Sequence, residues 1–267
     1  MKYPGRVIRA GESDPALVRA VRTQLNHRLS IAARSPGRLD ERAPAFDEAV
    51  VQAVRQFQAR NVDHDGRPLT QDGRIGPITW EVLFDGQSVP SAIKAADPYL
   101  GRMLTIALGE ADKQVREVPA NSNRGPRVEQ YQKRSKSRPG LAWCCSFVYW
   151  CMDEAAVAMS RRNPMVRTAG CLDHWHRSPT AGAKRIKKAQ ALQDPSLLKP
   201  GMIFIMDHGG GFGHTGIIAE VNGGFLNTVE GNTDASRTRE GGGVYRLTRK
   251  IGEINLGYID YAGLNAP

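Results

Sequence analysis

Three segments near the start of the chain place apolar residues on one helix face: Leu17, Val21 and Leu25; Val50, Val54 and Phe57; Trp80 and Leu83. Asp14 and Asp47 are suited to cap the first two helices, and Pro77 suits the start of the third. Loops with Asp-Gly pairs separate these segments. The pattern predicts three helices, which by themselves fit any small helical domain.

The pattern changes in the rest of the chain. A helix is predicted after Asp97, with apolar residues at Leu100, Met103, Leu104, Ala107 and Leu108, and another begins around Trp143. From Gly201 onward, short β-rich runs alternate with glycine: GMIFIM, HTGIIAEV, GFLNTVEGN, GVYRLTRK and LGYIDY. Helices followed by a strand meander predict an α+β fold with an antiparallel sheet. We place one domain at 1–86, a linker at 87–97, where small residues and prolines show no period, and a second domain at 98–267.

Composition narrows the possible partners. Among 267 residues, Lys and Arg exceed Asp and Glu by 37 − 27 = 10, which favours a polyanion such as nucleic acid, anionic lipid or a cell envelope. The alternative is a soluble protein from an organism that favours arginine. No apolar stretch reaches the roughly 18 residues of a membrane span, and the start lacks the apolar core of a secretory signal. Four cysteines without paired CxxC spacing indicate a reduced protein in which one thiol is special.

Cys144 is the candidate nucleophile. It lies in the first turn of the predicted helix WCCSFVYWCMDEAA, whose inward face carries Phe147, Val148, Cys151 and Ala155. A helix N-terminus beside an imidazole lowers a thiol pKa from about 8.5 into the range of roughly 3.5 to 7.5. A lone cysteine is more often a packing residue, so a histidine base and a third polar group must accompany it.

The segment HTGIIAEVNGGFLNTVEGNT supplies both groups if it folds as a hairpin with the three-residue loop 222–224. Val221 then faces Phe225, which sets Gly216 opposite Glu230 and His214 opposite Asn232 on one face. Ile217, Val221, Phe225 and Val229 lie on the other. A two-residue loop would shift the register by one and move Glu230 away from His214.

This hairpin makes His214 the general base for Cys144, with Glu230 or Asn232 fixing the imidazole tautomer. The thiolate attacks an amide carbonyl, the Cys144 backbone N–H meets the oxyanion, and water releases the acyl group. We expect sulfur and imidazole nitrogen to meet in an open groove. His208 is a rival base but precedes the glycine run 209–213, and His27 and His64 are expected as surface or helix residues.

The first domain resembles the peptidoglycan-binding domain of many wall hydrolases. The resemblance is carried by Gln24-Leu25, Ala53-Val54, Phe57-Gln58, Asp72-Gly73, Ile75-Gly76-Pro77, and Thr79-Trp80 with Leu83. The chain departs from that family in the longer segment 35–46, which replaces a short turn before the second helix.

The second domain resembles the CHAP family of cysteine, histidine-dependent amidohydrolases and peptidases. The motifs, in order, are Trp143-Cys144, Phe147-Val148, Pro200-Gly201, Gly213-His214, Gly216-Ile217 and Glu230-Gly231-Asn232-Thr233, with Arg116-Glu117 and NSNRGPRVEQY upstream. The resemblance implies a papain-like domain with Cys144 as nucleophile, His214 as base, Glu230 as orienting acid and Asn232 in support. It also implies substrate contacts at Trp143 and Gly213. Cys145 departs from the family, which usually has a small residue there, and raises the question of redox sensitivity.

Other features of the sequence point to alternative functions. Cys171, His174 and His176 do not fit a zinc spacing, so no metal or cofactor is expected. Basic clusters at 133–134 and 184–188 suggest nucleic acid, but aromatic residues make up only 7% and no known module is present. A wall-binding protein with an inactive catalytic site is a third possibility.

We therefore predict a monomeric hydrolase of an amide bond in the peptidoglycan stem peptide, tethered by its first domain. The start of the chain suggests that it is made in the cytoplasm and reaches the wall as a phage endolysin or as a secreted antibacterial effector. An effector would have an immunity protein. No nucleic-acid partner or membrane insertion is expected.

Overall fold

A computed structural model of the protein describes residues 1–85, 89, 91–238 and 241–264. The chain divides into two compact units, Met1–Pro90 with Leu192–Pro195, and Ser91–Ala191 with Ser196–Pro267. The predicted domain end at residue 86, and residues 87, 88 and 90 of the predicted linker, lie outside the described residues.

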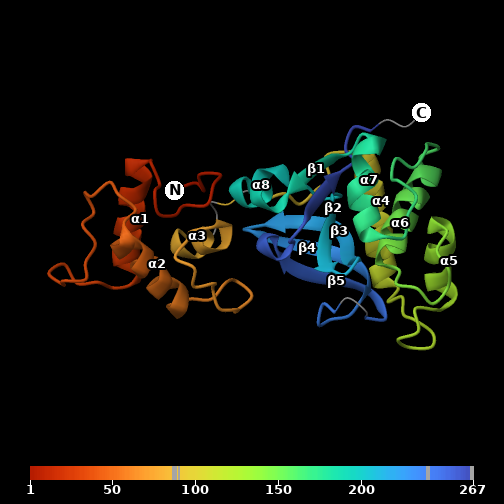
Figure 1. Ribbon diagram of the computed structural model, residues 1–267, viewed down its shortest axis with the longest axis horizontal. Helices are drawn as coiled ribbons and strands as arrows, with labels where there is room; N and C mark the ends of the chain where they lie inside the picture. Colours follow the sequence, from red (N-terminus) through yellow and green to blue (C-terminus); the bar gives the residue numbers. More distant parts are fainter. Residues whose placement is uncertain (86–88, 90, 239–240, 265–267) are drawn as a thin grey trace. The chain divides into compact units, whose positions relative to one another are not determined.

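The first unit contains the three predicted helices: α1 (Pro15–Arg28), α2 (Glu48–Arg60) and α3 (Pro77–Leu83) (Figure 1). The Asp14 carboxylate accepts hydrogen bonds from the backbone of the first turn of α1, and Asp47 does the same for α2. These caps satisfy amide groups that have no partner within the helix. The apolar faces meet in one core around Leu25, Phe57 and Trp80, all buried.

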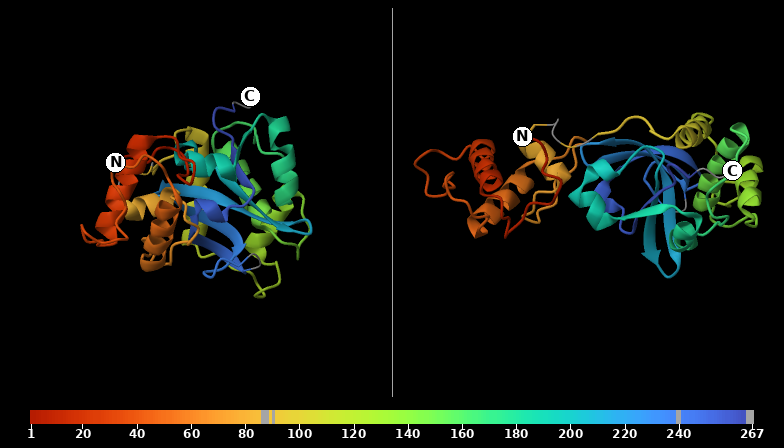
Figure 2. Two further views of the ribbon diagram at one scale, coloured as in Figure 1. Left: turned by 60° about the vertical axis from the view of Figure 1, so that its left-hand side comes forward. Right: turned by 90° about the horizontal axis from the view of Figure 1, so that it is seen from above.

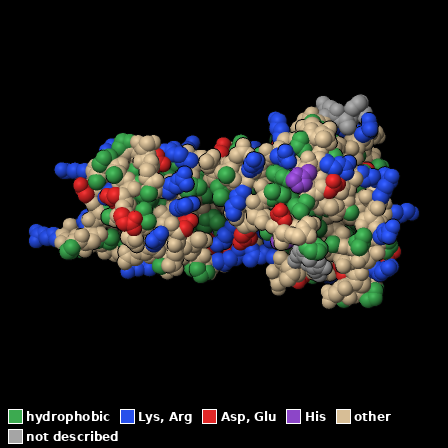
Figure 3. Space-filling view, viewed as in Figure 1, with side chains coloured by type: hydrophobic (Ala, Val, Ile, Leu, Met, Phe, Trp, Pro, Cys, Tyr) green, Lys and Arg blue, Asp and Glu red, His purple; other side chains and the backbone are tan. Residues whose placement is uncertain are grey.

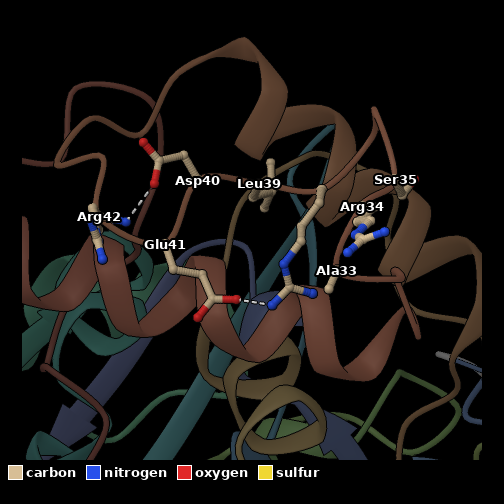
Figure 4. Close-up of a pocket in the computed structure, with 8 residues that line it drawn as sticks. Ala33, Arg34, Ser35, Leu39, Asp40, Glu41 and Arg42 are labelled. Atoms are coloured by element: carbon tan, nitrogen blue, oxygen red, sulfur yellow. Dashed lines mark hydrogen bonds and ion pairs between the residues drawn. The ribbon is translucent and has the colours of Figure 1, made fainter.

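The segment 35–46, where the chain departs from the peptidoglycan-binding family, is held against α1 by polar contacts. The Asn26 side-chain amide donates to the Leu39 carbonyl at 2.9 Å and accepts from the Leu39 amide at 3.0 Å. Arg38 and Glu41 form an ion pair beside a hollow of ≈ 390 Å³ lined by residues 33–35 and 38–42 (Figure 4). The long segment is therefore anchored by a buried asparagine, and its charged side chains face the hollow.

The second unit combines helices and one sheet. Its helices are α4 (Pro98–Asp112), α5 (Pro126–Ser135), α6 (Cys144–Ala158) and α7 (Cys171–Arg177), with short 3-10 turns at Ser178–Ala181 and Ile251–Glu253. Helix α8 (Lys188–Gln193) and the 3-10 turn Pro195–Leu197 belong partly to each unit. Helices α4 and α5 pack on α6, and all three gather on one side of the sheet in both Figures 1 and 2. Helix α6 is buried along most of its length, which suits its almost uninterrupted apolar sequence.

Six described strands form a single antiparallel sheet in the order β1-β6-β2-β3-β4-β5. They are β1 (Lys184–Lys187), β2 (Ile203–Gly209), β3 (Phe212–Asn222), β4 (Phe225–Thr233), β5 (Gly243–Lys250) and β6 (Gly257–Asp260). Strands β2 to β6 correspond to the five predicted runs. The fold is α+β with an antiparallel sheet, as predicted.

Strand β1 accounts for part of the positive charge. The basic cluster 184–188 supplies this edge strand, and lysines on an edge discourage pairing with other chains. Lys and Arg side chains are spread over the visible face of each unit with acidic side chains among them (Figure 3). None of the described helices is long and apolar enough to span a membrane.

The hairpin that carries the candidate base has a two-residue loop, so the predicted three-residue loop is wrong. Gly223 and Gly224 form it with φ of 54° and 89°, backbone that glycine adopts readily, and Asn222 pairs with Phe225. An irregularity between Ile218 and Glu220 then adds one residue to β3. Beyond it, Ile217 pairs with Val229, which is the predicted register. The bulge thus compensates for the shorter loop.

Candidate active site

Cys144 is the first residue of α6, directly after the cap residue Trp143. The Trp143 indole donates to Glu117 Oε1 at 2.8 Å, and Glu117 Oε2 accepts from the Asn123 backbone at 3.0 Å. Trp143 is 0% exposed and its ring lies 5.7 Å from that of Tyr131, between ring centroids. Trp143 was expected to contact the substrate. In the structure it is buried and anchors the start of α6.

His214 and Glu230 form the central pair of the site. His214 Nε2 lies 2.7 Å from Glu230 Oε2, and both side chains are buried. Because a carboxylate only accepts, Nε2 carries the proton of this bond. The other ring nitrogen, Nδ1, is buried, makes no hydrogen bond to a nitrogen or oxygen atom of the described residues, and remains available for proton exchange with the Cys144 thiol. Of the two residues proposed to orient the ring, Glu230 makes this contact.

Glu230 is held by two further side chains. Arg249, on β5, donates from Nε to Oε1 and from Nη2 to Oε2, both at 2.6 Å, and Thr228 Oγ1 donates to Oε1 at 2.6 Å. Burial by itself raises the Glu230 pKa, but the bonds from Arg249 and His214 outweigh it and lower the pKa to about 2. Glu230 is therefore ionised, with its oxygens fixed in direction.

Arg249 is the residue that sequence analysis missed. Its strand was predicted, yet the arginine is one of several basic residues in GVYRLTRK, and only its 5% exposure distinguishes it from a surface charge. The strand pairing contains a signal for it. Arg249 pairs with Leu226, which lies four residues before Glu230 on β4, so Arg249 and Glu230 are on the same face of the sheet. Only a correct β4–β5 register reveals that signal.

The thiol of Cys144 and the ring of His214 influence each other directly. Burial alone lowers the His214 pKa, but Cys144 and Glu230 outweigh it and raise the pKa to about 9. This favours the imidazolium that accompanies a thiolate. The Cys144 pKa is nevertheless raised well above its ordinary value by contact with Cys171 and by burial, while His214 acts to lower it. The predicted lowering of the thiol pKa is therefore not found in this arrangement.

Access to the pair is limited. Cys144 is 4% exposed and His214 is 1% exposed, so the expected open groove is not present around these two atoms. The Cys171 sulfur lies 3.4 Å from the Cys144 sulfur. Gly213 lies over Cys171, since a Cβ atom at Gly213 would stand 3.1 Å from that of Cys171. Cys171, at the start of α7, therefore covers the nucleophile, and Gly213, at the beginning of β3, packs against Cys171.

The remaining candidates are placed clearly. Asn232 is buried at the end of β4 with a left-handed φ of 59°. The rival base His208 is exposed, as are His27, His64 and His176. His174 is buried and shares a 2.8 Å hydrogen bond with the Tyr261 hydroxyl. Within residues 1–85, 89, 91–238 and 241–264, no three His, Cys, Asp or Glu side chains are grouped to hold a metal ion.

Comparison with known families adds to this geometry. Residues 136–232 match the CHAP domain. The match includes Cys144, His214, Glu230 and Asn232, so this part of the chain is similar to a CHAP domain. CHAP domains are typically cysteine- and histidine-dependent peptidoglycan hydrolases, so the match indicates this activity in general, with peptidoglycan as substrate. No curated protein and no solved structure matched the chain.

Proposed function

We propose that the protein hydrolyses an amide bond in the peptide stem of peptidoglycan, as an N-acetylmuramoyl-L-alanine amidase or a peptide endopeptidase. One observation carries the proposal: a cysteine at a helix start and a buried His-Glu pair lie within a segment that matches the CHAP domain, and Arg249, beyond that segment, holds the glutamate. Cysteine hydrolases require a thiol, a base and a group that orients the base, and all three are present.

The reaction follows from the positions of these groups. His214 Nδ1 accepts the Cys144 proton, and the thiolate sulfur bonds to the carbonyl carbon. The imidazolium returns the proton to the departing nitrogen as the C–N bond breaks, which leaves a thioester on Cys144. Water then gives one proton to His214 and attacks the thioester carbon. The C–S bond breaks, His214 returns that proton to the sulfur, and the product acid releases the second proton as it becomes a carboxylate. The Cys144 backbone N–H, at the start of α6, is our candidate donor to the oxyanion.

Ionised Glu230 keeps the Nε2 proton in place, so Nδ1 is the nitrogen that exchanges protons with sulfur. Asn232 is proposed as a supporting polar group near the end of the same strand. Substrate approach requires the Cys171 side chain, at the start of α7, to move off Cys144, because the sulfur is covered.

The first unit is proposed to tether the enzyme to the wall, which raises the local substrate concentration. Its support is the motif set around Asp72-Gly73 and Ile75-Gly76-Pro77 and the three-helix core in which those motifs lie. We further propose a monomer that reaches the wall as a phage lysin or as a secreted effector. In the effector setting an immunity protein would bind it.

Purified sacculi and Cys144→Ala test the proposal. The wild type should release soluble peptide fragments, and Cys144→Ala should release none while still sedimenting with sacculi. Cys151→Ala is the matched control, because Cys151 is a buried thiol of the same helix and is expected to affect stability alone. Equal release by the wild type and Cys144→Ala, or none by either, would contradict the proposed enzyme.

Mass spectrometry of the digest identifies the bond. A new amino terminus at L-alanine identifies an amidase, and one within the stem or cross-bridge identifies an endopeptidase. DNA retention at physiological salt, with no effect on sacculi, would support the nucleic-acid alternative instead.

A further inference from the structure

The four cysteines of the chain are free thiols, and two of them are in contact. The sulfur of Cys144 lies 3.4 Å from that of Cys171, 27 positions later in the sequence. Each is the first residue of its helix, α6 and α7. The candidate nucleophile therefore has a second thiol as its immediate neighbour.

Helix α7 is fixed where it makes this contact. Three residues after Cys171, the buried His174 ring is held by the Tyr261 hydroxyl at 2.8 Å. On the other side, the backbone of β3 lies against Cys171 at Gly213, where a Cβ atom would stand 3.1 Å from that of Cys171. Cys171 is thus held between a helix anchored through a buried hydrogen bond and a closely packed strand.

The contact has two consequences for Cys144. It covers the sulfur on the side of α7, leaving the residue 4% exposed. It is also the largest cause of the raised Cys144 pKa. Both effects weaken when the Cys171 side chain moves away from Cys144.

We propose that Cys144 and Cys171 form a reversible disulfide that switches the enzyme off. Peroxide converts the Cys144 thiol to a sulfenic acid and releases one water; Cys171 then displaces the hydroxyl as a second water, and the S–S bond forms. The two thiols supply two electrons and two protons, and peroxide accepts them. A bond of about 2.05 Å requires the sulfurs to approach by roughly 1.4 Å. A dithiol restores both thiols by exchange.

Cys145 is the competing partner. It is fully buried, its sulfur is directed to the Thr168 carbonyl at 3.6 Å, and it lies near enough to Cys171 to raise the pKa of that thiol. A Cys145–Cys171 bond would leave the nucleophile free. The direct contact between Cys144 and Cys171 favours the inhibitory pair.

Peroxide treatment of the full-length protein tests the proposal. Peptide mapping without reductant should find residues 144 and 171 cross-linked in the wild type and in Cys151→Ala, and dithiothreitol should remove the link. In Cys171→Ala and Cys171→Ser, prolonged peroxide should instead drive Cys144 to sulfinic and sulfonic acids, which dithiothreitol does not reverse. A cross-link between 145 and 171, or no cross-link, would overturn the proposal.

Activity on sacculi provides the second measurement. Wild-type turnover should fall on oxidation and recover fully with dithiothreitol, whereas Cys171→Ala should recover about tenfold less. Equal recovery by both proteins would also overturn the proposal. The inhibitory effect rests on the proposed hydrolase, but the cross-link is mapped without peptidoglycan. An inactive protein that still forms the 144–171 bond would contradict the proposed function and leave the disulfide established.

Discussion

Replacing Arg249 with glutamine tests the structure of the site most directly. The substitution removes two hydrogen bonds and the positive charge from Glu230, which is 0% exposed. Breaking a buried ion pair costs about 3 to 5 kcal/mol. The lowering of the Glu230 pKa from 4.5 to about 2, to which Arg249 contributes most, corresponds to about 3 kcal/mol. These two energies agree in magnitude.

The effect should depend on pH with a definite sign. A carboxylate whose pKa is lowered by folding stabilises the folded state above its unfolded value of 4.5, and this contribution is lost as the pH falls to about 2. The stability difference between wild type and Arg249→Gln should therefore be full at pH 7 and shrink between these limits. At neutral pH, about 3 kcal/mol lowers the melting temperature of the second unit by roughly 6 to 12 °C.

Turnover should fall as well, because Glu230 would no longer hold His214 in one direction. A displacement of the base by about 1 Å is expected to lower kcat about 100-fold with little change in KM. Arg249→Lys keeps the charge but cannot make the bidentate contact, so its melting temperature and kcat should lie between those of the wild type and Arg249→Gln.

Arg246→Gln is the matched control. Arg246 lies on the same strand and pairs with Asp112 at 2.6 Å, but the two side chains are 56% and 65% exposed. Loss of such a surface pair should change stability by less than about 1 kcal/mol. Calorimetry and sacculus turnover compare the two variants. If Arg249→Gln melts at the same temperature as Arg246→Gln and keeps full activity, the proposed support of Glu230 by Arg249 is refuted.

Three further predictions concern the base, the packing around the site and metals. The His214 pKa is raised to about 9, so its contribution to stability is full below pH 6.5 and lost as the pH rises to about 9. In denaturant unfolding, the difference in unfolding free energy between wild type and His214→Gln should be larger at pH 6 than at pH 9.5. An equal difference at the two pH values would disprove this prediction. A Cβ atom at Gly231 would lie 2.7 Å from the Trp143 ring, so Gly231→Ala should destabilise by about 1 to 3 kcal/mol in thermal melts. Gly109→Ala should not destabilise the protein, because a Cβ atom at this position on α4 meets open space. Equal melting temperatures for Gly231→Ala and Gly109→Ala would count against the close packing of Gly231 on Trp143. Finally, a strong chelator should leave hydrolysis of sacculi unchanged, and activity lost to it and restored by zinc would indicate a metal enzyme.

Local patterns in the sequence were sufficient to predict α1 to α4, α6, strands β2 to β6 and the position of Cys144 at a helix start, whereas α5, α7, α8 and β1 were not predicted. Each predicted feature depends on residues within a few positions of one another, such as the Asp14 and Asp47 caps. Alternation on β3 and β4 was also enough to predict that Glu230 and His214 would share a face. That prediction held even though its loop was wrong, because the buried faces of two strands constrain the register more strongly than the turn does.

Tertiary structure alone decided what surrounds the candidate nucleophile and base. Arg249 reaches Glu230 from a strand 19 positions away, and Cys171 reaches Cys144 from another helix, so neither contact leaves a periodic signal in the chain. The sequence also did not predict the burial of the Cys144 sulfur, because the same cysteine pattern is compatible with an open groove or with a covered sulfur. Hydrophobic periodicity reports which side of an element faces inward, whereas the distances between side chains on different elements depend on how those elements pack.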